Sequence, residues 1–467
     1  MLIDAAAVAA LRGEPFDWRF KALPPGFSGA PVTVGEYLAG RPRLTGFGTP
    51  LLTLERRAIE HNLATMASWT AAAGVSLAPH GKSTMAPALW KRQLDAGAWG
   101  LTLANLPQLR VARAFGVSRL MLAGALTDPA GLAWIGAQLD ADPGFSFLCW
   151  ADSLRTVEIM DAVLRGAARP VDVCVELGAP GGRTGARDEA EARAVAEAIR
   201  ASDRLRLAGI AGYEGALGHD ASPSSLGAVD AFLKRMASLH ADLPYEVDEP
   251  VVTAGGSAYF DQVVDVLGGL DGRLVLRSGA YIVHDDGFYR AISPFSRTAG
   301  LPGGAGPSNG AGSLGGGGLP GGAGPSNGAR SLDVGGLSSG AGSSRGTGPG
   351  PLRPAMHGWA RVVSRPEPGL ALLDAGKRDL PFDEGLPEPQ AVRGRPAEAL
   401  RGARVTALND QLTFLSVEAG SALDCGDVVR LGLSHPCTAF DKWTLIPVVD
   451  DVEADDPEVV DLVRTFF

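Results

Sequence analysis

Short apolar runs alternate with helical segments between residues 75 and 280. The runs fit buried strands, whereas the segments 153–168 and 188–202 repeat their apolar positions with the period of a helix. Strands that are apolar along their whole length are typical of a parallel sheet covered by helices on both faces. Eight such runs occur, at 75–80, 100–105, 119–124, 145–150, 171–178, 205–213, 250–255 and 273–279.

Eight strand–helix repeats in about 200 residues predict a (β/α)8 barrel of the TIM type. An open, doubly wound sheet is the rival architecture, because a count of strands does not establish closure.

The pattern changes after residue 355. Short strands separated by Gly, Pro and Asp turns predict an all-β domain that follows the barrel. Its expected strands lie at 359–365, 369–377, 403–410, 412–419, 427–433 and 443–449.

Residues 299–350 are rich in Gly, Pro and Ser, and the stretch GLPGGAGPSNGA begins both at Gly300 and at Gly318. Such a segment cannot bury enough apolar surface to offset the entropy of ordering it, so it is expected to be a disordered insertion. The expected divisions are an N-terminal extension at 1–45, a barrel at 46–298, the insertion at 299–352 and a β-domain at 353–467.

Charge and cysteine content narrow the classes of function. The formal net charge is -10 and no basic stretch offsets it, which argues against a nucleic-acid partner. No apolar run is long enough to span a membrane, and the N-terminus lacks the features of a signal peptide. Four widely spaced cysteines form no disulfide framework, so we expect a cytoplasmic protein.

The stretch PHGK contains the first candidate catalytic residues. His80 and Lys82 follow the first barrel strand and, with one residue between them, are expected to face the mouth of the barrel, where active sites of this fold lie. A partly desolvated lysine there could form a Schiff base with a carbonyl compound. A solvated lysine that opens a helix is the alternative.

Glycine-rich turns follow later strands. Arg183 lies in GGRTG after the fifth strand, and Tyr213 ends the sixth, where its phenol could cover a bound ring. A salt bridge and rim packing are the alternatives for these two side chains. The turn TAGGS, with Gly255, Gly256 and Ser257, follows the seventh strand and is expected to bind a phosphate through backbone N–H groups.

The stretch RSGAY follows the eighth strand. Its residues Arg277, Gly279 and Tyr281 are expected to complete the same phosphate pocket, because barrels often bind phosphate after strands seven and eight.

In the β-domain, His435 and Cys437 are separated by one residue. An imidazole and a thiolate suit zinc, although two ligands do not complete a site. A turn with a buried cysteine is the alternative interpretation.

Together, PHGKSTMAP, GGRTG, TAGGS and HPC resemble the fold-type III pyridoxal-phosphate enzymes, in which an alanine-racemase-like barrel precedes a β-domain. More narrowly they resemble the group of D-serine dehydratases, D-threonine aldolases and amino acid deaminases. The resemblance covers about 45–290 and 355–450. It implies pyridoxal 5'-phosphate as cofactor, with Lys82 as its Schiff-base lysine and the base for the α-proton.

The resemblance also assigns the other residues. Arg183 would face the pyridine ring and Tyr213 would flank it, while the glycine-rich turns and Tyr281 would hold the phosphate. His435 and Cys437 match the metal pair of the dehydratases, in which zinc assists loss of the β-hydroxyl; the aldolases carry His-x-Asp instead. Relatives usually have histidine at the position of Leu412, which leaves the metal affinity and the exact substrate open, and Asp410 could compensate.

The resulting expectation is a lyase that deaminates a β-hydroxy D-amino acid, with D-serine converted to pyruvate and ammonia. A D-threonine aldolase is the nearest alternative, followed by a racemase and by a non-catalytic pyridoxal-phosphate-binding protein. The resemblance also implies a homodimer.

Overall fold

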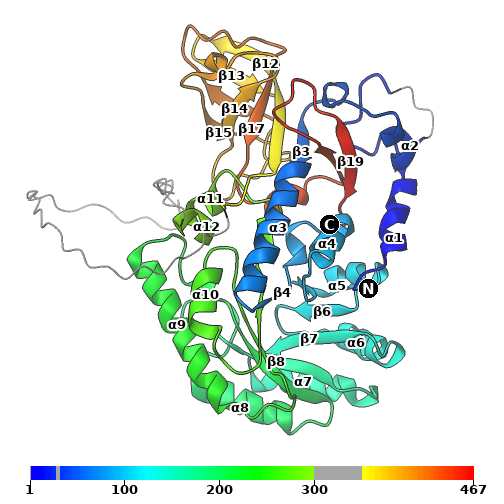
Figure 1. The fold of residues 1–467 in the computed structure, drawn as a ribbon, viewed down its shortest axis with the longest axis vertical. Coiled ribbons are helices and arrows are strands. Elements are labelled where there is room, and N and C mark those ends of the chain that lie inside the picture. The colour runs from blue at the N-terminus through cyan, green and yellow to red at the C-terminus, as the bar shows by residue number, and fades with distance from the viewer. Residues whose placement is uncertain (1, 28–31, 299–349) are drawn as a thin grey trace, which may run out of the picture.

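The structure, a computed structural model, describes residues 2–27, 32–298 and 350–467. Of the insertion expected to be disordered at 299–352, residues 299–349 lie outside the described residues. The remaining chain forms a barrel-containing lower part and a strand-rich upper part in Figure 1.

Eight parallel strands form the barrel, in the order β4-β11-β10-β9-β8-β7-β6-β5. Each lies within one of the eight apolar runs or overlaps it, so the predicted strands are confirmed. Their bounds are β4 Ser76–Leu77, β5 Leu101–Leu103, β6 Arg119–Leu122, β7 Ser146–Ala151, β8 Val171–Leu177, β9 Leu205–Gly212, β10 Val251–Ala254 and β11 Arg273–Leu276.

The sheet closes between β4 and β5. A parallel bridge joins His80 to Thr102, and the Thr102 hydroxyl donates a hydrogen bond of 2.7 Å to the carbonyl oxygen of Ala78. Closure confirms the barrel over the open doubly wound sheet. The interior is filled by a separate cluster of buried side chains, namely Ala78, Met121, Leu148, Trp150, Cys174, Ala208, Ala211, Val251 and Val275.

Helices surround this sheet (Figure 1). Five of them, α5 to α9, begin at a side chain that accepts a hydrogen bond from the first turn, which fixes where each helix starts; these side chains are Asn105, Asp128, Ser153, Asp188 and Ser222. The α-helices are α3 Arg56–Ala72, α4 Pro87–Asp95, α5 Leu106–Ala114, α6 Pro129–Ala141, α7 Leu154–Val163, α8 Glu189–Arg200, α9 Pro223–Asp242, α10 Phe260–Leu267, α11 Phe288–Ile292 and α12 Pro294–Thr298. Short 3-10 helices occur at η1 Leu11–Gly13, η2 Leu44–Gly46, η3 Gly81–Ser83, η4 Leu164–Gly166, η5 Glu214–Ala216, η6 Ala280–Ile282 and η7 Ala397–Leu400.

The second domain is mostly β, as predicted. Its strands are β12 Met356–Glu367, β13 Leu370–Leu373, β14 Glu388–Val392, β15 Arg404–Leu408, β16 Thr413–Ser416, β17 Val428–Gly432, β18 Leu445–Val449 and β19 Val459–Arg464, with the short helix α13 Cys437–Phe440. The sequence patterns did not indicate β14 or β19.

One strand from the N-terminal half of the chain belongs to this β-sheet. β3 (Leu51–Glu55) pairs antiparallel with β12 and parallel with β18. The expected boundary at residue 46 assigns these residues to the barrel, whereas their hydrogen bonds place them in the β-domain sheet. The chain therefore passes directly from the β-domain sheet into the barrel part, because α3 begins at the residue after β3.

The N-terminal segment contains α1 Ala5–Ala10, β1 Pro15–Phe16, β2 Val32–Thr33 and α2 Val34–Ala39. It is held by a cluster of aromatic rings, in which Phe16 stacks on Tyr37 with centroids 4.0 Å apart and meets Phe47 edge-on. Lys21 forms an ion pair of 2.8 Å with the buried Asp379 of the β-domain. This segment thus packs on the body of the protein.

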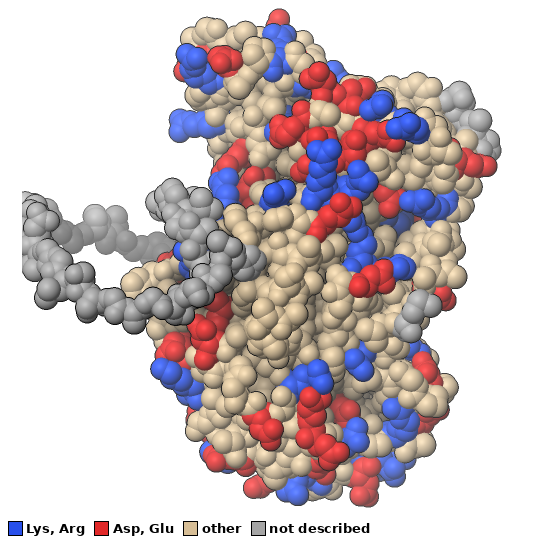
Figure 2. Space-filling view, viewed as in Figure 1, with Lys and Arg blue, Asp and Glu red and all other residues tan. Residues whose placement is uncertain are grey.

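On the face shown in Figure 2, lysine and arginine side chains are interspersed with aspartate and glutamate. Among the described residues, no helix combines the length and the apolar character needed to cross a membrane.

Candidate active site

A cavity of about 820 Å³ opens where the barrel strands end. Its walls include residues that follow almost every strand of the barrel, and the β-domain closes one side with Glu384, His435 and Cys437. Most of the predicted site residues line it: His80, Lys82, Arg183, Tyr213, Gly256, Ser257, Gly279, His435 and Cys437. The structure thus brings together residues from both domains.

Lys82 lies in the 3-10 turn η3, directly after β4. The turn is fixed by Trp90, whose indole N–H donates to the carbonyl oxygen of Gly81 at 3.1 Å. Lys82 is partly buried and has no ion-pair partner among the described residues. Burial lowers the pKa of its ammonium group, although the nearby Cys437 opposes this shift. A neutral amine, which is the nucleophilic form, is therefore more accessible here than on the surface.

His80 forms the floor of the cavity beside Lys82. Burial lowers its pKa well below the usual value, and the positive charges of Lys82 and Arg277 act in the same direction. Its Nδ1 atom is buried without a hydrogen-bond partner among the described residues. His80 is therefore a neutral ring beside the lysine, and its catalytic role stays a prediction.

Arg183 and Tyr213 lie together at the rim. The guanidinium carbon of Arg183 is 5.2 Å from the centre of the Tyr213 ring, in a cation–π contact. Both side chains are exposed, Tyr213 by 37%. A cofactor ring could therefore reach both side chains, and their contacts with such a ring stay predictions.

In the loop after β10, which was expected to bind a phosphate, two backbone N–H groups are bound by a carboxylate of the protein. The N–H groups of Gly255 and Gly256 donate to the carboxylate of Glu214, at 3.0 and 2.7 Å. Gly255 has a φ of +92°, a conformation that favours glycine. Ser257 and Gly279 line the cavity, whereas Gly255 does not.

Tyr281 is not brought into this cavity. Its side chain points, within η6, into a separate cavity of about 330 Å³ that is also lined by Gln93 and Arg273. After β11 the chain makes a tight turn. The backbone of Gly279 lies at the active-site cavity, whereas the side chain of Tyr281 is directed away from it. The phenol therefore has no access to the site that the sequence assigned to it.

Two buried charged residues also line the cavity: Arg277, which was expected at the phosphate pocket, and Glu176, which was not expected. Arg277 is 6% exposed and donates to the Thr253 hydroxyl at 2.7 Å and to the carbonyl oxygen of Gly212 at 2.6 Å. Glu176 accepts a hydrogen bond of 2.9 Å from Thr184, and burial raises its pKa. The only sequence signal for Glu176 is its position at the end of a barrel strand.

The His435–Cys437 pair begins α13, after the end of β17. The His435 backbone N–H donates to the buried carboxylate of Asp285 at 3.0 Å, and His435 has a φ of +48°. Cys437 donates a hydrogen bond of 3.2 Å from its thiol to the hydroxyl of Ser83, the residue after Lys82. This hydrogen bond joins the β-domain loop to the barrel turn that contains Lys82.

Asp383 orients the His435 ring. Its carboxylate is 2.6 Å from Nδ1 of His435 and also accepts from the Thr438 hydroxyl. Burial opposes the charged imidazole, but the interactions with Asp383 and with Cys437 together raise the pKa of His435 to about 10. No spacing in the sequence connects Asp383 with His435, so sequence reasoning did not find it.

The imidazole nitrogen of His435 and the sulfur of Cys437 are the kinds of atom that bind a divalent metal such as zinc. With Nδ1 bound to Asp383, the Nε2 atom of His435 is the nitrogen left for a metal, in the carboxylate–histidine arrangement that is common at metal sites. The described residues contain no group of three or more His, Cys, Asp or Glu side chains placed to hold an ion. The protein would thus supply two ligands and leave positions for substrate or water.

Leu412 and Asp410 lie elsewhere. Leu412 is in the turn between β15 and β16, where its carbonyl oxygen accepts from the Asn409 N–H, and it does not line the cavity. The Asp410 carboxylate is exposed and pairs with Arg378 at 3.2 Å. Asp410 is therefore not placed to replace a missing metal ligand in this chain.

Taken together, the closed parallel barrel, the lysine at the end of its first strand and the β-domain that completes the cavity define an alanine-racemase-like protein. The sequence model described as "Alanine racemase, N-terminal domain" matches residues 54–264, and that described as "Putative serine dehydratase domain" matches 355–449. The chain belongs to the fold-type III pyridoxal-phosphate enzymes of the D-serine dehydratase and D-threonine aldolase group.

Individual relatives agree with this assignment. A D-threonine aldolase of Arthrobacter sp is 27% identical over 440 residues, which cover 93% of this chain and 95% of the relative. A crystal structure of D-threonine aldolase from Filomicrobium marinum has a TM-score of 0.68 at 22% identity and covers 91% of this chain and 96% of its own. D-threo-3-hydroxyaspartate dehydratase from Delftia sp. HT23 has a TM-score of 0.63 at 19% identity, with coverages of 90% and 97%.

Proposed function

We propose that this protein is a lyase that acts on a β-hydroxy D-amino acid with pyridoxal phosphate and a divalent metal. One observation carries the proposal: the partly buried Lys82 and the His435–Cys437 pair, from different domains, line a single cavity. A lysine for the cofactor and a metal pair for a hydroxyl group are what a reaction at adjacent α- and β-carbons requires.

The barrel residues fit the cofactor. Bound pyridoxal phosphate would supply an electron sink for the substrate's α-carbon. Lys82 would hold the cofactor through its side-chain nitrogen and move a proton at the α-carbon, because burial favours its neutral form. Arg183 and Tyr213 would flank the ring, and Ser257 and Gly279 would contact the phosphate.

The β-domain residues would act on the hydroxyl. His435 and Cys437 would hold a divalent metal, which polarises a bound oxygen as a Lewis acid. Asp383 would keep the His435 ring in place. The solved relatives include a D-threo-3-hydroxyaspartate dehydratase variant described as being in the metal-free form, which supports a metal in this group without naming it.

Retro-aldol cleavage of D-threonine to glycine and acetaldehyde is the better supported reaction. The relative that covers almost the whole chain is named a D-threonine aldolase, as is the structural relative with the TM-score of 0.68. This favours the alternative over the D-serine deaminase that the sequence motifs predicted.

Dehydration is the second candidate, because Cys437 offers a thiolate at the metal pair. In that case D-serine would give pyruvate and ammonia. The racemase and the non-catalytic binding protein are less well supported, since neither requires the metal pair that the β-domain places beside Lys82.

The two reactions are distinguished by their products. Purified protein loaded with pyridoxal phosphate is incubated with D-threonine or D-serine, with the L-amino acids as controls. We expect glycine and acetaldehyde from D-threonine; pyruvate and ammonia from D-serine would favour the dehydratase. Lys82→Ala is expected to abolish either activity, whereas Lys91→Ala, which removes a surface lysine paired with Asp95, should retain it.

If the protein holds the cofactor but forms the products of neither reaction, the lyase assignment is wrong. We also propose a homodimer, which sedimentation of the loaded protein would test.

A further inference from the structure

Glu214 is a buried carboxylate at the end of β9, next to Tyr213. It is fully buried and accepts hydrogen bonds from two backbone N–H groups of the loop after β10, those of Gly255 and Gly256. The sequence had assigned these two N–H groups to a phosphate. In the structure an anion of the protein itself binds them.

The same loop is held from its other side. The Ser278 hydroxyl donates to the carbonyl oxygens of Gly255 and Gly256, at 3.3 and 2.9 Å. Arg277, which is also buried, places its positive charge near Glu214. Three consecutive barrel strands thus converge on this loop through side-chain contacts.

Other donors remain for a phosphate. Ser257 and Gly279 line the cavity, and their backbone N–H groups have no acceptor among the described residues. A Cβ atom at position 279 would lie 2.5 Å from the carbonyl oxygen of His80, so this backbone approaches the lysine turn closely. A phosphate on these donors would not compete with the Glu214 carboxylate, whereas one on Gly255 and Gly256 would have to displace it.

We infer that Glu214 is a positioning residue that holds the loop after β10, so that the N–H groups of Ser257 and Gly279 receive the cofactor phosphate and those of Gly255 and Gly256 do not. The inference rests on the proposed use of pyridoxal phosphate. It replaces the phosphate contacts that the glycine motif suggested with a carboxylate clamp inside the protein.

The test compares cofactor binding with and without the phosphate group. Apo-protein and its Glu214→Gln variant are titrated with pyridoxal phosphate and with pyridoxal, and visible absorbance gives each Kd. We expect Glu214→Gln to raise the Kd for pyridoxal phosphate by about tenfold, the effect of weakening a hydrogen bond to a charged group, and to change that for pyridoxal less than twofold.

Glu246→Gln is a matched control. The Glu246 carboxylate accepts the Leu207 N–H at 2.7 Å near the start of the same strand, away from the cavity, and its substitution should leave both Kd values unchanged. Should Glu214→Gln fail to fold, Ser278→Ala loosens the same loop from its carbonyl side and should show the same phosphate-selective loss.

Unchanged or tighter binding of pyridoxal phosphate by both variants would overturn the inference, because it would mean that Glu214 competes with the phosphate or is indifferent to it. Equal weakening for both ligands would also overturn it. Wild-type protein that binds no pyridoxal phosphate would overturn the proposed function as well, whereas wild-type protein that binds it without lyase activity would overturn the proposed reaction alone.

Discussion

The thiol of Cys437 lies 3.2 Å from the hydroxyl of Ser83, although 354 residues separate them in the chain. Ser83 follows Lys82 in the turn η3, so one hydrogen bond joins the His435–Cys437 pair of the β-domain to the turn that contains Lys82. This contact fixes the position of the β-domain loop relative to the substrate's α-carbon in the proposed reaction.

Ser83→Ala is expected to weaken metal binding and to leave cofactor binding intact. The substitution removes a hydrogen bond worth about 1 kcal/mol, which corresponds to roughly a fivefold rise in the metal Kd. Competition between the protein and a chelating dye for Zn2+ measures this change. Ser202→Ala, which removes a hydrogen bond to Asp161 on the far side of the barrel, is the control, and an equal Kd in wild type and Ser83→Ala would refute the prediction.

Asp383→Asn is expected to lower metal affinity more strongly. The carboxylate binds Nδ1 of His435 at 2.6 Å and so directs Nε2 towards the site. Loss of such a partner typically costs 10- to 100-fold in metal affinity. The same competition assay gives the Kd.

Asp441→Asn is the matched control for this substitution, because Asp441 ends α13 and contacts Lys442. If both variants bound the metal as the wild type does, Asp383 would not orient His435 in the way that its contacts indicate.

Asp286→Asn is expected to stabilise the protein at neutral pH. Burial raises the pKa of Asp286 to about 6 from 3.8, and its Oδ2 atom has no hydrogen-bond partner among the described residues. Between these two pKa values the unfolded state releases the proton and the folded state keeps it, so this group makes the protein less stable as pH rises from about 4 to about 6. Asparagine does not titrate, so the variant does not lose this stability as the pH rises.

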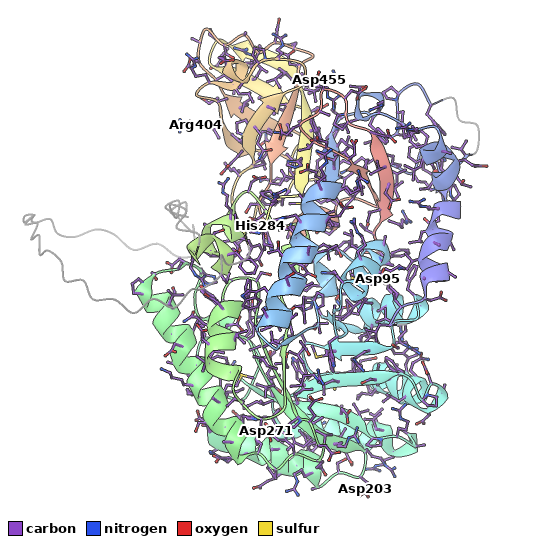
Figure 3. The ribbon with its side chains drawn as sticks, viewed as in Figure 1. Asp95, Asp203, Asp271, His284, Arg404 and Asp455 are labelled. Carbon is purple, nitrogen blue, oxygen red and sulfur yellow. The ribbon has the colours of Figure 1, made fainter. Side chains whose placement is uncertain are left out.

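The measurement is urea unfolding at pH 4, 5, 6 and 7. The difference in free energy of unfolding between variant and wild type should grow with pH, by up to about 3 kcal/mol. Asp203→Asn, at the opposite end of the barrel from the domain junction near His284 (Figure 3), controls for a general charge effect. A difference that stayed constant with pH would show that Asp286 ionises freely in the folded protein.

The barrel could be predicted because each strand is an apolar run and most of its residues are buried. β3, β14 and β19 were missed. β3 pairs with strands about 300 and 400 residues further along the chain, and no local pattern encodes such pairing.

The same limit applies to the site. Lys82, His435 and Cys437 stand in recognisable short motifs, whereas Glu214 and Asp383 act on residues 41 and 52 positions away. The direction of Tyr281 depends on a 3-10 turn whose geometry the motif does not specify. The sequence thus allowed us to predict which motif residues lie at the ends of the strands, but not which residues form hydrogen bonds with their polar atoms.

Cys437→Asp is expected to change which metal supports activity. A thiolate is a soft ligand that favours Zn2+, while a carboxylate favours harder ions such as Mn2+ and Mg2+. After chelation, the wild-type protein should recover lyase activity best with Zn2+, and the variant best with Mn2+. The assay follows product formation from D-threonine and D-serine over a series of added metals.

Cys425→Ser removes an exposed cysteine far from the cavity lining and should keep the wild-type order of metals. The same metal order in wild type and Cys437→Asp would mean that the thiol does not bind the metal, and activity that survives chelation would remove the metal from the proposed reaction.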